Sequence, residues 1–269
     1  MIKLVSTDFD GTLVDHYATP PVDPELFEAI RQLQARGVYW ALNTGRDFEF
    51  ALDGLREFSF PCEPDYVLTA EREVFHRGAD GQWQDYGDWN QRCYRAHDKM
   101  FAQAAPLLKD IADFLAVESL AQPICEGERL IGLAANDEPA MDRICEFLER
   151  ERLRVPGFHY MRNTIYVRFC HADYSKGTAL SELGRLTGID REGIFAAGDH
   201  YNDLPMLDGR HARWVMCPAN AVEPVKTTVR AAGGYVAERE FSSGVVEALR
   251  HFRALPSGEL VLPTGPGAA

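Results

Sequence analysis

Two aspartates near the start of the chain are the side chains whose spacing first suggests chemistry. Asp8 and Asp10 follow the apolar segment 2–7, which is rich in β-branched residues, and they precede Gly11. This pattern predicts a buried strand that ends in a sharp turn. Side chains two residues apart on an extended chain lie on the same side, so both carboxylates can reach one ligand. A cation or phosphate chemistry would relieve their mutual repulsion, although the same pattern is also common in solvated turns.

Polar side chains follow other predicted strands or open predicted helices further along the chain. They are Thr44, Arg46, Lys176, Asp199, Asn202 and Asp203. Each alone has an ordinary explanation as a turn residue, a solvated charge or a helix cap. In open α/β sheets, however, ligands bind at the carboxyl edge of the strands. Since chance rarely produces this order of strand-end residues, we expect them to meet Asp8 and Asp10 in one site.

The segments on either side of a central insertion alternate strands and helices. Asp23 and Pro24 form a helix start, and the helix closes at Gly37 before a second strand at 38–42. This β-α-β-α rhythm returns from residue 175 onward. It predicts an α/β fold with a doubly wound, parallel, Rossmann-like sheet.

Between these segments the rhythm changes to that of an antiparallel α+β module. Its expected elements are a helix at 99–117, strands at 121–125 and 130–135, a helix at 139–152, and strands at 158–161 and 164–169. A hairpin turn at Arg162 and Asn163 would join the last two strands. The expected domains are a core formed by 1–84 and 171–255, an inserted cap at 85–170, and a flexible tail at 256–269.

Composition narrows the class of partner. Hydrophobic residues make up 46% of the chain, charged residues make up 26%, and the formal net charge is −13. This balance allows a buried core and argues against nucleic-acid or anionic membrane partners, which need basic surfaces. No apolar run approaches the length of a membrane span, and six scattered cysteines without a C-x-x-C pair suggest reduced thiols. We therefore expect a cytoplasmic protein, either a monomer or a homodimer.

The chain resembles the haloacid dehalogenase superfamily of phosphotransferases. Residues 8–12 match its D-x-D-G-T motif, and residues 198–203 match its G-D-x-x-N-D motif. Thr44 and Lys176 match the residues of the second and third motifs. The inserted module resembles a type IIB cap, which is typical of the Cof-like branch with its many sugar-phosphate phosphatases. The segment 70–72, Ala-Glu-Arg, departs from the Asn-Gly turn of that branch.

The resemblance implies a role for each aspartate. Asp8 would be the nucleophile that forms an aspartyl-phosphate, and Asp10 would be the general acid and then the base. The implied cofactor is Mg²⁺, held by Asp8, the backbone carbonyl of Asp10, and Asp199. Asp203 would be a further metal ligand or a partner of the lysine. Hard oxygen donors without a histidine or cysteine cluster favour Mg²⁺ over zinc.

The remaining residues would bind the substrate. Thr44 and Lys176 would contact the transferring phosphoryl group, and Asn202 would donate a hydrogen bond nearby. Arg46 would contact phosphate or substrate, or form a surface salt bridge. The expected function is a Mg²⁺-dependent phosphatase acting on a small phosphate ester, most readily a sugar phosphate. A phosphomutase and a phosphate-ligand binding protein without turnover are the alternatives.

Overall fold

The computed structural model describes residues 1–255, so the expected tail at 256–269 lies outside the described residues. The chain divides into two compact units. The first comprises Met1–Gly87 together with the described residues from Lys176 onward, and the second comprises Asp88–Ser175. All the residues proposed above for the site belong to the first unit.

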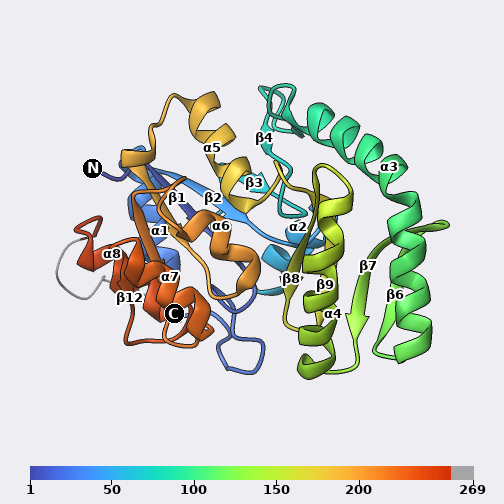
Figure 1. Ribbon diagram of the computed structural model, residues 1–269. Coiled ribbons are helices and arrows are strands. Elements are labelled where there is room, and N and C mark those ends of the chain that lie inside the picture. The colour runs from blue at the N-terminus through green and yellow to red at the C-terminus, as the bar shows by residue number, and fades with distance from the viewer. Residues whose placement is uncertain (256–269) are drawn as a thin grey trace. The chain divides into compact units, whose positions relative to one another are not determined.

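An eight-stranded sheet forms the centre of the first unit (Figure 1). The strands, in order across the sheet, are β12 (Tyr235–Val236), β11 (Trp214–Cys217), β10 (Ile194–Ala197), β1 (Leu4–Thr7), β2 (Tyr39–Asn43), β3 (Tyr66–Leu68), β4 (Phe75–Arg77) and β5 (Trp83–Asp85). The strands from β12 to β3 run parallel, and β4 and β5 add an antiparallel edge. The strand order reverses at β1, which is the position where such sheets bind ligands.

The register of the central strands brings their carboxyl ends to one level. Thr7, the last residue of β1, pairs with Leu42 of β2 and with Ala197 of β10. All of β1 and β10 is buried, as expected for parallel strands covered on both faces. The residues that follow β1, β2 and β10 therefore emerge side by side.

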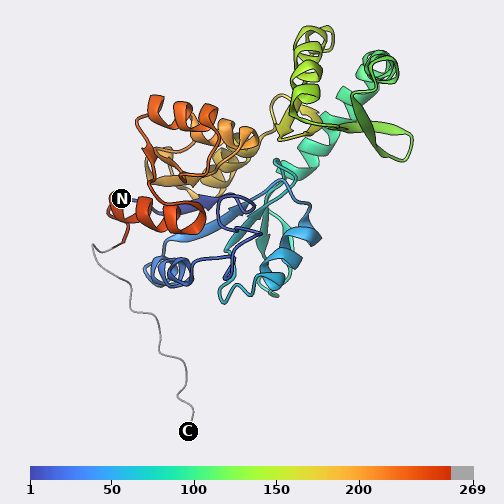
Figure 2. The same cartoon turned by 90° about the horizontal axis from the view of Figure 1, so that it is seen from below.

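Helices cover both faces of this sheet (Figure 2). One face carries α1 (Pro24–Ala35), α2 (Phe48–Glu57) and α8 (Phe241–His251), and the other carries α5 (Lys176–Thr187), α6 (Leu204–Leu207) and α7 (Glu223–Ala231). Short 3₁₀ turns, η2 (Arg191–Gly193) and η3 (Tyr201–Asp203), flank β10. Asp23 and Asp47 cap α1 and α2 by accepting hydrogen bonds from backbone N–H groups of their first turns. The apolar faces of α1, α2 and α8 share one core with the sheet.

The second unit has its own sheet and its own core. Its elements are α3 (Trp89–Glu118), β6 (Ala121–Glu126), β7 (Arg129–Ala135), α4 (Glu138–Glu151), η1 (Arg152–Arg154), β8 (Phe158–Asn163) and β9 (Tyr166–His171). The strands form an antiparallel sheet in the order β6-β7-β9-β8. Apolar side chains of α3 and α4 pack with this sheet in a separate cluster. The predicted α/β class, with a Rossmann-like sheet and a separate antiparallel region, is confirmed.

Two boundaries in the second unit differ from the sequence prediction. Helix α3 begins at Trp89, ten residues before the predicted start. Its first turns bury Asn90 and His97 beside Trp89 and Cys93, so polar side chains interrupt the apolar stripe. The turn of the last hairpin is also later than predicted. Arg162 and Asn163 pair within the β8–β9 ladder, and the turn follows at Thr164, whose φ is 50°.

None of the helices within residues 1–255 combines the length and the apolar character needed to cross a membrane. The six cysteines all lie in this part of the chain and form no disulfide.

Candidate active site

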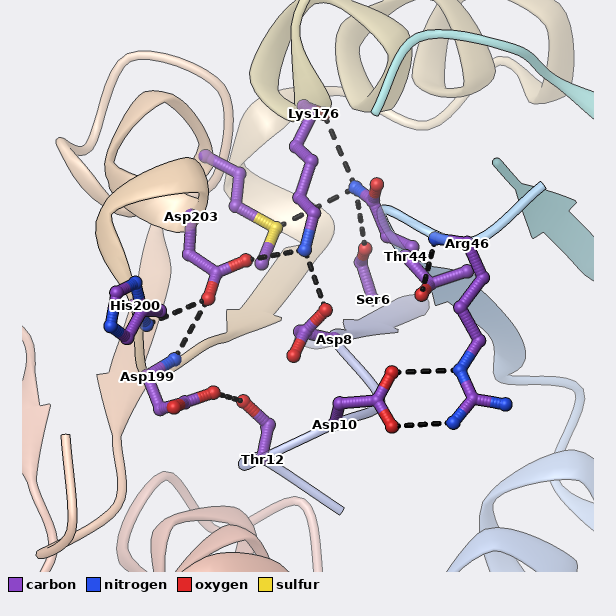
Figure 3. Close-up of polar contacts among 12 residues, drawn as sticks. Ser6, Asp8, Asp10, Thr12, Thr44, Arg46, Lys176, Asp199, His200 and Asp203 are labelled. Carbon is purple, nitrogen blue, oxygen red and sulfur yellow. Dashed lines mark hydrogen bonds and ion pairs between the residues drawn. The ribbon is translucent and has the colours of Figure 1, made fainter. Parts of the chain in front are cut away.

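A buried lysine joins two aspartates at the carboxyl edge of the sheet (Figure 3). Lys176 opens α5, and its Nζ donates hydrogen bonds to Asp8 Oδ1 at 2.5 Å and to Asp203 Oδ1 at 2.7 Å. The side chains of Lys176 and Asp203 are fully buried, and that of Asp8 is 8% exposed. Asp8 directly follows β1, so this ion-paired network fixes the first carboxylate against the start of α5.

The loop after β10 presents a third carboxylate to the same place. Asp203 Oδ2 accepts hydrogen bonds from the backbone N–H groups of Asp199 and His200, which holds the loop closed. Asp199 Oδ1 accepts from Thr12 Oγ1 at 2.7 Å. The loop after β1 approaches very closely here. Gly11 has a φ of 83°, and a Cβ on it would lie 2.5 Å from Asp199 Oδ2. Only glycine fits this contact without displacing the carboxylate.

Like charges dominate the electrostatics of this cluster. Burial, with the charges of Asp203 and Asp199, raises the pKa of Asp8 well above its usual value although Lys176 opposes the shift. Burial and the charge of Asp203 raise the pKa of Asp199 to about 7. Burial alone would lower the pKa of Lys176, but the carboxylates of Asp203 and Asp8 raise it, so the lysine stays protonated.

The three carboxylates can hold a metal ion. One oxygen each from Asp8, Asp199 and Asp203 lies within 4.8 Å of the others, and all three residues are buried. Three carboxylates against one lysine leave two negative charges uncompensated, and buried charges require a partner. A divalent cation with a preference for oxygen ligands fits this donor set.

Asp10 faces a different set of partners. Arg46 donates from Nε to Asp10 Oδ2 at 2.8 Å and from Nη2 to Oδ1 at 2.6 Å, a bidentate pair. His16 Nε2 lies 2.7 Å from the same Oδ1. Burial opposes ionisation of Asp10, but the hydrogen bonds and charge of Arg46, with those of His16, lower its pKa overall. The Arg46 side chain is only 8% exposed and also covers the Phe9 ring, whereas the Asp10 side chain is 38% exposed, so the pair is half-buried.

Thr44 and Asn202 complete the set of residues predicted from sequence. Thr44 is buried at the end of β2, and its Oγ1 accepts a hydrogen bond from the backbone N–H of Arg46. Asn202 lies in η3 with 4% exposure, and its Oδ1 has no hydrogen-bond partner among the described residues. Asn43 links the end of β2 to the start of α5, because its Nδ2 donates to the carbonyl oxygen of Lys176.

The structure therefore brings Asp8, Asp199, Asp203 and Lys176 into one cluster and places Asp10 with Arg46 beside it (Figure 3). Sequence reasoning did not foresee the contact between His16 and Asp10. His16 lies in the irregular segment between β1 and α1, where no periodicity indicates which way a side chain points. Only its position six residues after Asp10 gave a signal.

Comparison with known proteins identifies the family. The family model of the haloacid dehalogenase-like hydrolases matches residues 5–70 and 130–249. The chain belongs to this family. A phosphoglycolate phosphatase of Methanothrix thermoacetophila is 34% identical, over 94% of this chain and 98% of its own. Because the chain belongs to this family and its relatives include phosphatases, it is a phosphatase. The superfamily predicted from the sequence is confirmed.

Solved structures extend the likeness in fold. The sucrose-phosphatase of Synechocystis, solved with sucrose and phosphate, superimposes with a TM-score of 0.69 at 22% identity, over 94% of this chain and 98% of its own. A sugar phosphatase of haloacid dehalogenase subclass IIB gives a TM-score of 0.66 at 18% identity, over 94% of this chain and 100% of its own. At these identities the likeness concerns the fold.

Proposed function

We propose that this phosphatase is Mg²⁺-dependent and hydrolyses a small phosphorylated metabolite, with sugar phosphates as the leading class, through an aspartyl-phosphate on Asp8. The observation that carries the proposal is the position of Asp8. Its carboxylate is fixed by Lys176 at 2.5 Å and lies beside Asp199 and Asp203 at the carboxyl edge of β1. The sugar-phosphate class is supported by the names of two fold neighbours, a sucrose-phosphatase and a subclass IIB sugar phosphatase, and of one relative, a bifunctional trehalose-6-phosphate synthase/phosphatase.

Mg²⁺ fits the oxygen donors of Asp8 and Asp199, with Asp203 adjacent. When bound, the ion offsets the repulsion between carboxylates and phosphate and stabilises the negative charge of the transition state. Asp203 already gives both of its oxygens to Lys176 and to two backbone N–H groups. Its main task would therefore be to orient Lys176 and the loop of Asp199. The Asp10 carbonyl remains a predicted ligand.

The first half of the reaction uses Asp8 as nucleophile. A carboxylate oxygen of Asp8 attacks phosphorus, and the bond between phosphorus and the ester oxygen breaks. Lys176 holds Asp8 in place and supplies positive charge to the phosphoryl oxygens, and the Thr44 hydroxyl donates to one of them. Asp10 gives a proton to the departing alkoxide, which leaves as an alcohol. Because Arg46 and His16 lower its pKa, Asp10 must take up this proton before the step.

The second half returns the enzyme to its starting state. Asp10, now ionised, accepts a proton from a water molecule that attacks the aspartyl-phosphate. The acyl-phosphate bond breaks, inorganic phosphate is released, and the Asp8 carboxylate is restored. The pair with Arg46 and the contact with His16 favour the ionised form of Asp10, which is the form that this step requires.

A phosphate-release screen tests the proposal directly. Sugar phosphates, nucleotides, other small phosphoesters and an aryl phosphate are incubated with the enzyme, with and without Mg²⁺. We expect Mg²⁺-dependent release, with one class of ester far ahead of the rest. Asp8→Asn should abolish turnover, because an amide cannot serve as the nucleophile. Asp10→Asn should lower kcat by about 10²- to 10⁴-fold.

Two results would redirect the proposal. Slow release from every ester, together with transfer of phosphate between positions of a sugar, would identify a phosphomutase. No release from any ester by a folded, Mg²⁺-loaded protein that still binds phosphate would refute hydrolysis and indicate a binding protein.

A further inference from the structure

Glu71 occupies a strained position beside the turn that carries Thr44 and Arg46. Ala70 and Glu71 have φ values of 48° and 66°, two consecutive non-glycine residues in the left-handed region. The strain is held by backbone hydrogen bonds from Ala70 N to Arg46 O at 2.8 Å and from Glu71 N to Thr44 O at 3.1 Å. Such conformations are costly for residues with a Cβ and concentrate at functional sites.

The side chain of Glu71 is buried against the catalytic turn. Glu71 is 8% exposed, and a Cβ built on Gly45 would lie 3.3 Å from its Oε1 and 3.7 Å from Asn202 Nδ2. Gly45 stands between Thr44 and Arg46, so the Glu71 carboxylate and the Asn202 carboxamide lie on the same side of this turn. Because Gly45 has no side chain, no Cβ crowds the Glu71 carboxylate at this turn.

Both groups present acceptors that no donor of residues 1–255 satisfies. The Glu71 carboxylate makes no hydrogen bond or ion pair with any of these residues. Asn202 Oδ1 is buried and equally without a partner there. Leaving the buried Asn202 Oδ1 unpaired is costly, which suggests that a ligand supplies its donor. The neighbouring Glu71 carboxylate, whose oxygens water can reach, offers the same ligand a further acceptor.

We propose that Glu71, together with Asn202, selects the alcohol part of the substrate, favouring phosphate monoesters that bear hydroxyl donors over esters that bear a carboxylate. The proposal rests on the phosphatase function proposed above. A carboxylate only accepts hydrogen bonds, so a substrate hydroxyl can donate to it, whereas a substrate carboxylate would meet a like charge. A polyol or sugar phosphate satisfies this site, and a phosphorylated carboxylic acid such as phosphoglycolate does not.

A matched pair of esters tests the selectivity. Glycerol 3-phosphate and 3-phosphoglycerate differ in one terminal group, a hydroxymethyl in the first and a carboxylate in the second. We expect wild-type kcat/KM to favour glycerol 3-phosphate. Glu71→Gln removes the charge and supplies a donor, so it should lower this preference by about tenfold or more. Glu57→Gln removes the same charge from the exposed end of α2 and should leave the preference unchanged.

A second variant separates selectivity from folding. Glu71→Gly removes the whole side chain at a φ that suits glycine, so it should lose the preference while melting no lower than wild type. A wild-type preference for 3-phosphoglycerate, or the same ratio in Glu71→Gln and Glu71→Gly as in wild type, would overturn the proposal.

Binding measurements test the role of Glu71 separately from the proposed hydrolase activity. Calorimetric titration of both esters into the Asp8→Asn protein, with and without Glu71→Gln, measures selectivity without turnover. A ratio of Kd values that Glu71→Gln leaves unchanged, or no binding of either ester, would overturn the role of Glu71. If Glu71→Gln changes the ratio of Kd values but the protein with Asp8 intact hydrolyses no ester, the selective role of Glu71 stands and the proposed hydrolase activity is refuted.

Discussion

Replacing Lys176 by methionine tests the central electrostatic argument. The substitution keeps the approximate length of the side chain and removes the one cation that contacts both Asp8 and Asp203. Because Lys176 is fully buried, water cannot take over its role. Removing one partner of a buried ion pair typically destabilises a protein by about 3–5 kcal/mol, since it leaves an uncompensated charge.

The free energy of unfolding that Lys176→Met loses should depend on pH, and the dependence can be calculated. When the lysine charge is removed, one of the neighbouring carboxylates must take up a proton in the folded protein. Protonating an aspartate of ordinary pKa costs about 4 kcal/mol at pH 7 and about 1.5 kcal/mol at pH 5. The folded variant then holds a carboxyl proton that its unfolded state has lost at neutral pH, so its stability relative to wild type improves as the pH falls.

Urea unfolding of wild type and Lys176→Met, measured at pH 7 and pH 5 in EDTA, gives both losses. EDTA prevents a metal ion from replacing the lysine charge. The control is Lys109→Met, whose pair with Asp113 joins two side chains that are 75% and 64% exposed and should contribute little to stability. A loss below about 1 kcal/mol at pH 7, or equal losses at both pH values, would refute the reasoning.

Three further predictions concern the cation and Asp10. Mg²⁺ should raise the melting temperature more at pH 8 than at pH 6. Asp199, with its pKa raised to about 7, is protonated at pH 6 and must lose that proton to bind a metal. Equal shifts of the melting temperature at the two pH values would contradict this. Gly11→Ala should lose the Mg²⁺ response by displacing Asp199. Gly37→Ala, at a similar φ of 77° with open space around it, should keep that response in the same thermal melts. Arg46→Lys replaces two hydrogen bonds to Asp10 by one, so it should lower kcat about tenfold with less effect on KM. Steady-state kinetics in which KM changes and kcat does not would argue against a role in catalysis.

The sequence was most informative where local rules decide the structure. The strand before Asp8 and the strand before Asp199 follow from short apolar runs with turn residues after them, and their parallel pairing follows from the alternation with helices. The start of α3 was predicted wrongly because buried polar side chains broke the periodicity. The contacts of His16 and the backbone of Glu71 were beyond prediction, since both residues lie in irregular segments where no periodicity fixes the direction of a side chain.

The placement of Glu71 separates selectivity from chemistry along the sheet. The groups that would handle phosphate follow β1, β2 and β10 and open α5, whereas Glu71 follows β3, one strand further out. Substitutions at Glu71 should therefore change the relative kcat/KM of different esters and leave Mg²⁺-dependent hydrolysis of an aryl phosphate, which has no terminal hydroxyl or carboxylate, nearly unchanged. A parallel fall in the rates of all esters would instead mean that the Glu71 loop supports Thr44 and Arg46 through its backbone hydrogen bonds.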